Sequence, residues 1–266
     1  MKSVWALTRA HWRAALSYRV AMAFSVAGLV LSIVPVYFIA EALQPTMAPV
    51  IAGQGEDYFR FLVLGMVALH FVGAATTDIP LVARRSIRSG TLEAMIGTPV
   101  SLPTIFAGLS GYDFLRTAVR SLLFVSAAAV LGASLVPARI PLALVILLFI
   151  VIAHIPFGML AVALLLAFRT MAGVPRIALG ASALLGGAYY PTEVIPSWIE
   201  IPSYALPLTY GLRALRRVLL EGQGVGAVAG DVAILGALTL VLFLIGALAL
   251  AGGLRYARRD GNLAIY

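Results

Sequence analysis

The amino-acid sequence predicts an all-α polytopic membrane protein with six transmembrane helices. Of its 266 residues, 62% are hydrophobic and 11% are charged, whereas soluble proteins average roughly 45–50% and about 25%. The mean hydropathy of +1.01 is too high to come from one membrane anchor, so most of the chain has hydrocarbon as its solvent. These observations exclude a soluble globular domain.

Six apolar runs are the candidates for these helices. A helix that crosses a hydrocarbon core of about 30 Å needs roughly 20 apolar residues, because no water is present there to satisfy backbone polar groups. The runs cover residues 20–40, 61–82, 115–136, 141–168, 177–190 and 232–254. Residues 102–114 precede the third run and are interrupted by proline and glycine, so they form either an interfacial elbow or an extension of that helix. The fifth run has a continuation that the sequence does not place.

The basic residues predict how the bundle is oriented. With both termini in the cytoplasm, fourteen of the nineteen Lys and Arg residues fall in inner segments, and five fall in outer ones. Positive residues are retained on the cytoplasmic side, so this bias predicts cytoplasmic N- and C-termini. The excess of arginine over lysine favours a GC-rich bacterium and therefore a bacterial cytoplasmic membrane.

Residues 1–19 predict an amphipathic helix that lies along the inner lipid headgroups. On a helix, Lys2, Arg9 and Arg13 share one face, and Val4 and Leu7 lie opposite. The alternative is a basic N-terminus that only sets orientation. The apolar run that follows has about 21 residues, longer than the 7–15 of a secretory signal, so it is expected to remain as the first span.

The sequence excludes a phosphate-binding ATPase loop. Lys2 is the only lysine, and no G-x-x-x-x-G-K-[ST] motif occurs, although this loop needs a lysine to reach the β- and γ-phosphates. Another polypeptide must therefore hydrolyse any ATP that drives this protein. The chain has no cysteine, which excludes thiolate metal sites, and we expect no metal or cofactor. The basic residues sit at the ends of apolar runs, so we expect lipid and no nucleic acid as a partner.

The segment between the fifth and sixth runs is too apolar for a free loop and too rich in proline for a span. Its last part is amphipathic: leucines 208, 212, 215 and 219 share one face, and Arg213, Arg216 and Arg217 share the other. We expect residues 190–222 to form short helices that dip into the outer leaflet and return. Non-helical backbone at that depth must be buried in protein or line a cavity.

Two stretches of sequence resemble those of a known family. Residues 90–100, GTLEAMIGTPV, match the pattern G-T-L-E-x-[LM]-x-x-[ST]-P-V, and residues 187–198 match G-x-x-[YF]-P-x-E-x-[LI]-P-x-W. Residues 206–216 continue the second stretch as L-P-L-T-Y-x-L-x-x-[LM]-R. Together with the order of the six runs, these motifs resemble the membrane subunits of ABC exporters of the second type, the drug, lipid and polysaccharide export permeases. The resemblance covers essentially the whole chain, residues 1–266, as one permease domain.

The resemblance implies a division of labour between subunits. Such a permease dimerises, binds two copies of a separate P-loop ATPase on the cytoplasmic side, and passes its substrate outward along the dimer interface. It is not itself an enzyme, and ATP and Mg²⁺ bind to the partner subunit. The sequence leaves open whether the dimer is a homodimer or a heterodimer with a related permease.

The resemblance also implies roles for particular residues. Residues 90–97 match the coupling helix that contacts the ATPase, with Gly90, Thr91, Leu92, Glu93, Met95 and Ile96 as its contact residues. Residues 190–222 match the outer re-entrant helices, whose gate residues are Tyr190, Pro191, Glu193, Pro196, Trp198, Pro207, Tyr210 and Arg213. The alternative for residues 90–97 is an ordinary inner loop with its usual arginines.

Few ionisable residues lie within the predicted spans. His70 and His154 lie toward the middle of two of them and are candidates for a polar pathway. The commoner role for a single histidine is a neutral imidazole bonded to a backbone carbonyl. Asp113, Arg116 and Arg120 share one helix face and predict a charge cluster near the inner surface.

The composition of the spans favours an apolar or amphipathic substrate, drug-like or lipid-like, because no asparagine or glutamine lies within a predicted span. Lipid-linked glycans are the alternative, since aromatic residues gather at the outer mouth. An ion-driven transporter would need midspan carboxylates or inverted repeats, which we do not find. An intramembrane serine protease would need Ser110 beside His154, yet the two are expected at different depths. A scaffold without transport activity also stays open.

Overall fold

The computed structural model describes residues 19–88, 102–171 and 173–259, and this part of the chain is all helical, with no strands. Its first half contains α2 (Arg19–Met47), α3 (Tyr58–Gly73), the π-helical η1 (Ala74–Asp78), α4 (Ile79–Arg88) and α6 (Leu102–Val130). Its second half contains η2 (Pro137–Arg139), α7 (Ile140–Phe168), α8 (Val174–Leu185), η3 (Thr192–Val194), α9 (Ser197–Ser203), α10 (Pro207–Leu219) and α11 (Val225–Arg259).

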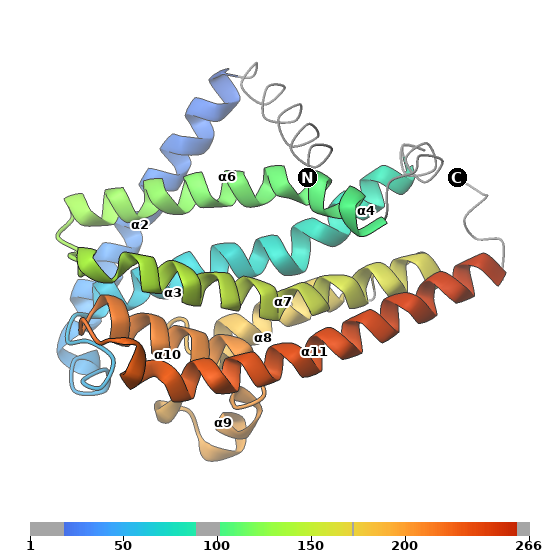
Figure 1. Ribbon diagram of the computed structural model, residues 1–266. Helices are drawn as coiled ribbons and strands as arrows, with labels where there is room; N and C mark the ends of the chain where they lie inside the picture. The colour runs from blue at the N-terminus through green and yellow to red at the C-terminus, as the bar shows by residue number, and fades with distance from the viewer. Residues whose placement is uncertain (1–18, 89–101, 172, 260–266) are drawn as a thin grey trace.

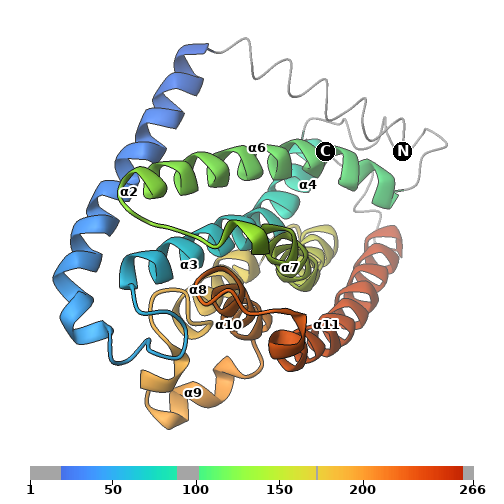
Figure 2. The ribbon, with the colours of Figure 1, turned by 60° about the vertical axis from the view of Figure 1, so that its left-hand side comes forward.

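The long helices form a bundle, and the short helix α10 packs against three of them. Helices α3, α4, α6, α7 and α11 run side by side, and α2 crosses them obliquely (Figure 1). Helix α10 packs against α3, α7 and α11, and α9 lies on the outside of the bundle beyond α8 and α10 (Figure 2). Helices α4, α7 and α11 all end at the same end of the bundle, here called the basic end because these helix ends carry Arg88, Arg169 and Arg259 (Figure 1).

Four helical stretches in the described part are long and apolar enough to cross a membrane. They are Ala27–Met47, Tyr58–Ser86, Pro137–Phe168 and Val225–Ala257. Helix α6 has 29 residues but carries three charged residues in its middle. Helix α8 has 12 residues and is therefore about 18 Å long, shorter than a hydrocarbon core of about 30 Å.

Several helix boundaries differ from the predicted spans. Residues 102–114 extend the third helix instead of forming an elbow, and that helix ends at Val130, where Gly132 turns the chain with a φ of 99°. Helix α8 ends at Leu185 because Gly186 and Gly187 follow it, so residues 186–190 are not helical. Helix α11 is longer than residues 232–254 at both ends. Helix α7 ends at Phe168, as predicted, and begins one residue earlier.

The second candidate span is one continuous helix with a π-helical segment in its middle. Helix α3 continues through η1 into α4 without a break in the backbone. Pro80 has no N–H to donate to the carbonyl four residues earlier, so the regular α-helical bonding is interrupted just before it. Gly158 of α7 allows close approach at this point, because a Cβ there would lie 2.6 Å from the carbonyl oxygen of Ala75.

Helices α7 and α11 pack closely through small residues. A Cβ on Gly246 would lie 3.0 Å from Cα of Pro156, and a Cβ on Gly253 would lie 2.6 Å from the carbonyl oxygen of Ala163. The two glycines are two helical turns apart and therefore share one face of α11. Small residues permit this kind of backbone contact between membrane helices, which have no hydrophobic force to drive them together.

We expect Gly253→Ala to destabilise the protein by about 1–3 kcal/mol, the usual cost of overpacking a tight contact. Gly252→Ala is the matched control, because a Cβ on that neighbouring glycine would meet no other helix within 4 Å. The measurement is the thermal midpoint of each purified variant in the same detergent. Equal midpoints for the two variants would contradict the close contact between α7 and α11.

Candidate functional site

Helix α10 lies inside the bundle although three of its thirteen residues are arginines. Leu208, Leu212, Leu215 and Val218 belong to the buried core that α10 shares with α3, α7 and α11. The sequence predicted that the three arginines share one polar face. In the structure Arg216 is instead only 1% exposed, because α10 has protein on more than its apolar side.

Arg216 is bound by backbone carbonyls from two other segments. Its guanidinium donates hydrogen bonds to the carbonyl oxygens of Gly187 at 2.8 Å, Ala188 at 3.1 Å and Phe61 at 3.2 Å. It also donates to the side-chain oxygen of Gln54 at 3.3 Å, and its central carbon lies 3.2 Å from the centre of the Phe61 ring. One side chain therefore joins α10 to α3, to the loop before α3 and to the turn after α8.

The position of Arg216 explains how a buried positive charge is tolerated. Gly187 and Ala188 directly follow Gly186, the C-cap of α8, so the guanidinium lies at the negative end of that helix dipole. Burial lowers the pKa of the Arg216 guanidinium to about 9, while the nearby Glu193 and Tyr58 act in the opposite direction. With that pKa, Arg216 remains charged at neutral pH.

The turn after α8 depends on glycine. Gly187 has a φ of 80°, a left-handed conformation that costs glycine nothing. On the facing helix, a Cβ on Gly65 would lie 2.1 Å from the carbonyl oxygen of Ala188, so only glycine lets α3 pass this close. The hydroxyl of Tyr58, the first residue of α3, donates to the carbonyl of Tyr189 at 2.9 Å, which fixes the same turn at a second point.

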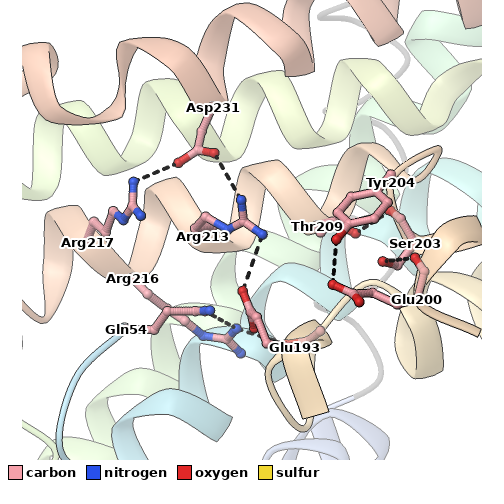
Figure 3. A network of polar contacts seen from close by, with 11 residues as sticks. Gln54, Glu193, Glu200, Ser203, Tyr204, Thr209, Arg213, Arg216, Arg217 and Asp231 are labelled. Carbon is pink, nitrogen blue, oxygen red and sulfur yellow. Dashed lines mark hydrogen bonds and ion pairs between the residues drawn. The ribbon is translucent and has the colours of Figure 1, made fainter. Parts of the chain in front are cut away.

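The two other arginines of α10 form an ion-pair network with acids from two neighbouring elements (Figure 3). Arg217 contacts Asp231 of α11 at 3.2 Å, and Arg213 lies 3.7 Å from the other oxygen of the same carboxylate. Arg213 also contacts Glu193 of η3 at 3.4 Å. Asp231 is only 9% exposed, so this shared carboxylate joins α10 to the first turns of α11.

The connection from α9 to α10 is held by hydrogen bonds of its own. Thr209 donates to the carbonyl of Ser203 at 2.8 Å, and the Tyr210 hydroxyl donates to the carbonyl of Tyr204 at 3.1 Å. The Tyr204 hydroxyl donates to the carboxylate of Glu200 at 2.5 Å. Trp198 is 74% exposed on α9, so this short helix presents an aromatic side chain outward.

The structure brings together part of the predicted gate. Glu193 and Arg213 are paired, and the guanidinium of Arg213 lies 6.0 Å from the centre of the Tyr210 ring. Pro191 and Pro207 are buried, Tyr190 is half-buried, and Pro196 and Trp198 are exposed. The predicted coupling residues, Gly90 to Ile96, and the predicted interfacial helix, residues 1–19, lie outside the described residues except for Arg19 at the start of α2.

The two histidines have different surroundings. His154 is fully buried, and its Nδ1 lies 2.7 Å from the carbonyl oxygen of Ile150. Its Nε2 lies 3.3 Å from the hydroxyl of Ser182 on α8, so a neutral ring that donates from Nδ1 satisfies both contacts. His70 is half-buried, its Nδ1 lies 3.4 Å from the hydroxyl of Ser121, and it lines a polar cavity described below.

Sequence reasoning did not name Arg216, Arg217 or Asp231 as site residues. Asp231 directly precedes the apolar run 232–254, so the sequence alone leaves it outside the last span, whereas α11 begins at Val225 and includes it. One sequence signal could have indicated the ion pair of Arg217 and Asp231: Asp231 directly precedes the last apolar run, and that run follows the helix that carries the three arginines. Within the described residues, no cluster of histidine and acidic side chains could hold a metal ion.

Comparison with known proteins identifies the class of this protein. The family model for the ABC-2 type transporter matches residues 2–220, which extend from the N-terminal segment to the end of α10. No match was found among curated protein sequences. The chain therefore belongs to the ABC-2 type transporter family. It is the multi-pass membrane permease domain of such a transporter, and this domain lacks an ATPase domain.

We expect Arg216→Lys to lower the thermal midpoint of the purified protein in detergent. One ammonium group cannot bond three carbonyls and stack on Phe61 at once, and each buried carbonyl left without a partner costs about 1–3 kcal/mol. Arg213→Lys is the control, because the Arg213 side chain is 24% exposed and its ion pairs tolerate an ammonium. If the two variants melt at the same temperature, Arg216 does not hold the turn after α8.

Proposed function

We propose that the protein is the permease subunit of an ATP-driven exporter that moves an apolar or amphipathic substrate outward across a bacterial cytoplasmic membrane. The observation that carries this proposal is the family match over residues 2–220. Permeases of this family generally pair with an ABC ATPase subunit. In this proposal two copies of a separate ATPase bind a permease dimer, either a homodimer or a heterodimer with a related permease.

The distribution of arginines supports six spans with both termini in the cytoplasm. Helices α4, α7 and α11 end together at the basic end of the bundle (Figure 1), where Arg85, Arg88, Arg169, Arg255 and Arg259 lie near their ends. The opposite end holds the loop with Glu56 and Asp57 before α3. The opposite end also holds Arg60 and Arg139, but arginine is in excess at the basic end, and such an excess is the pattern of cytoplasmic segments. In this proposal α6 and α8 are the third and fifth spans.

The exposed surface of α2 supports an apolar contact along the dimer axis or with lipid. Phe24, Leu31 and Phe38 are 75%, 66% and 65% exposed, and their spacing of seven residues places them on one stripe of the helix. An apolar stripe of this kind suits drug-like or lipid-like cargo better than a strongly polar solute. Lipid-linked polysaccharide is the second candidate, because the exposed Trp198 of α9 and Tyr204 just after α9 could stack on sugar rings at the outer mouth.

The segment from η3 to α10 is proposed as the outer re-entrant gate. The contact that supports this role is the pair formed by Glu193 of η3 and Arg213 of α10, since a partly exposed ion pair can open at little cost in free energy. Tyr190, Pro191, Pro196, Trp198, Pro207 and Tyr210 complete the proposed gate. His70 and His154 are retained as proposed pathway residues, and His70 lines a cavity.

The segment between α4 and α6 is proposed as the coupling helix that contacts the ATPase. Gly90, Thr91, Leu92, Glu93, Met95 and Ile96 would form that contact. Helix α4 ends at Arg88 and α6 begins at Leu102, so the segment connects two helices at the basic end of the bundle. A rigid connection between two long helices can transmit movement to both.

The coupling role predicts the behaviour of Glu93→Arg. The complex of the chain with its ATPase is reconstituted in vesicles, and ATP hydrolysis and uptake of a fluorescent amphipath are measured together. We expect the variant to insert normally and to lose most of its uptake per ATP hydrolysed, because a reversed charge disrupts the contact with the ATPase. Glu56→Arg, the same reversal at the opposite end of the bundle, is the control and should transport normally.

Two outcomes of this experiment would contradict the proposals separately. Normal coupled uptake by Glu93→Arg removes Glu93 from the coupling contact and leaves the exporter intact. Failure of the wild-type chain to copurify with any ATPase, together with uptake driven by an ion gradient alone, would overturn the ATP-driven exporter itself.

The proposed gate predicts a change in transport without a change in stability for Glu193→Gln. The Glu193 side chain is 53% exposed, so loss of its ion pair should change stability by less than about 1 kcal/mol. We expect the uptake rate in the same vesicles to change at least about twofold, because the pair no longer holds η3 against α10. Glu221→Gln, at an acid just beyond α10, is the control, and equal uptake rates would remove Glu193 from the gate.

A further inference from the structure

A polar cavity of about 390 Å³ lies between α2, α3, η1, α6 and α8. Its polar lining comes from His70, Thr77, Asp78, Arg116, Thr117 and Arg120. Charged residues at this depth in a membrane helix are costly unless they are paired or line a wet cavity, and they usually mark a functional site. Nothing in the gate or the coupling segment uses this cluster.

The cavity lies near the middle of the bundle, about halfway between the basic end and the opposite end. Asp78 is eight residues before the end of the candidate span Tyr58–Ser86, whereas His70 is twelve residues after its beginning. Arg116 and Arg120 belong to α6, fourteen and eighteen residues after Leu102. The cavity therefore lies at about mid-depth in the candidate span Tyr58–Ser86 and in α6.

The charges around the cavity have a positive excess. Asp78 interacts electrostatically with Asp113 and with three arginines, Arg116, Arg85 and Arg120. Arg120 also interacts electrostatically with the imidazole of His70. Three arginines against two aspartates leave one unit of positive charge, and the lining itself has two arginines against Asp78 alone. This balance favours an anion over a cation.

The remaining polar groups suit an oxyanion. The hydroxyls of Thr77 and Thr117 can donate hydrogen bonds, and arginine guanidinium groups bind phosphate oxygens in pairs. Three residues of the π-helical η1 line the cavity, namely Ala74, Thr77 and Asp78. π-helical turns of this kind are frequent at functional sites.

Apolar side chains complete the lining. Leu29 of α2, Leu69 of α3 and Leu179 of α8 lie beside the charged groups, and the cavity volume falls within the roughly 300–1,000 Å³ of small-molecule sites. A site with arginines on one side and leucines on the other suits a molecule with a charged head and an apolar body.

We propose that this cavity binds the phosphate or phosphodiester head of an amphipathic molecule, with its apolar body against the leucines. This inference rests on the proposed function for the identity of the ligand as cargo. It narrows the substrate class from any apolar or amphipathic molecule to one with an anionic head.

The test is a binding measurement on the full chain in detergent, without ATPase. Dioctanoyl phosphatidic acid, dioctanoylglycerol and inorganic phosphate are titrated against the wild type, an Arg116→Gln/Arg120→Gln variant and an Arg255→Gln control. Arg255 is an exposed arginine at the far end of α11. Thr117→Val, which removes one hydroxyl at a buried position with little change of shape, serves if the double variant does not fold.

We expect the wild type and Arg255→Gln to bind phosphatidic acid at least about tenfold more tightly than dioctanoylglycerol, because a charged hydrogen bond contributes about this factor. The double variant should lose that preference, and Thr117→Val should weaken binding of phosphatidic acid several-fold without affecting dioctanoylglycerol. Inorganic phosphate should bind more weakly than phosphatidic acid, because it lacks the apolar body.

Three results would overturn the proposal: equal affinity of the wild type for the two lipids, an unchanged preference in the double variant, or inorganic phosphate binding as tightly as phosphatidic acid. The last result would show a site for a free anion. The binding result is independent of the transport result. Selective binding of phosphatidic acid by a chain that shows no ATP-driven uptake would retain the site and overturn the exporter.

Discussion

A buried backbone polar group needs a hydrogen-bond partner, and the arrangement around α10 follows from this constraint. The long helices satisfy their own backbone groups, but the turn at Gly187 and Ala188 cannot. Arg216 donates to both of these carbonyls and to the carbonyl of Phe61. Its guanidinium therefore supplies the hydrogen bonds that water would supply to an exposed turn. Gly65 makes the arrangement possible, because any larger residue would push α3 away from the turn.

Buried charges also need partners, and this requirement explains the ion pairs between α10 and its neighbours. Asp231 lies near the start of α11 and is shared by Arg213 and Arg217, so η3, α10 and α11 are connected by one set of ion pairs. Arg216 fixes α10 to the bundle, while the partly exposed pair of Glu193 and Arg213 fixes η3 to α10. Helix α10 is held by buried hydrogen bonds, whereas η3 is held to it by a partly exposed ion pair. In the proposed gate, η3 can therefore move while α10 stays in place.

Sequence reasoning predicted some elements well and others poorly, for identifiable reasons. Helix α7 was placed to within one residue because its apolar run is bounded by Pro141 on one side and Arg169 on the other. The fifth run was predicted to end five residues too late, since no charged residue follows Leu185 before residue 190, although Gly186 and Gly187 end the helix. Arg216 was placed on a polar face because helical periodicity describes one helix and contains no information about its neighbours.

The sequence by itself determined that the protein is a helical, multi-pass permease of the ABC-2 type. Hydropathy, helix length and short motifs are properties of neighbouring residues, so they can be read along the chain. Only the tertiary structure decided that Arg216 is buried, that Asp231 joins two arginines of α10, and that Asp78 and Arg116 line one cavity. These facts depend on which side chains from distant segments come within a few ångströms, and that is decided by how the helices pack.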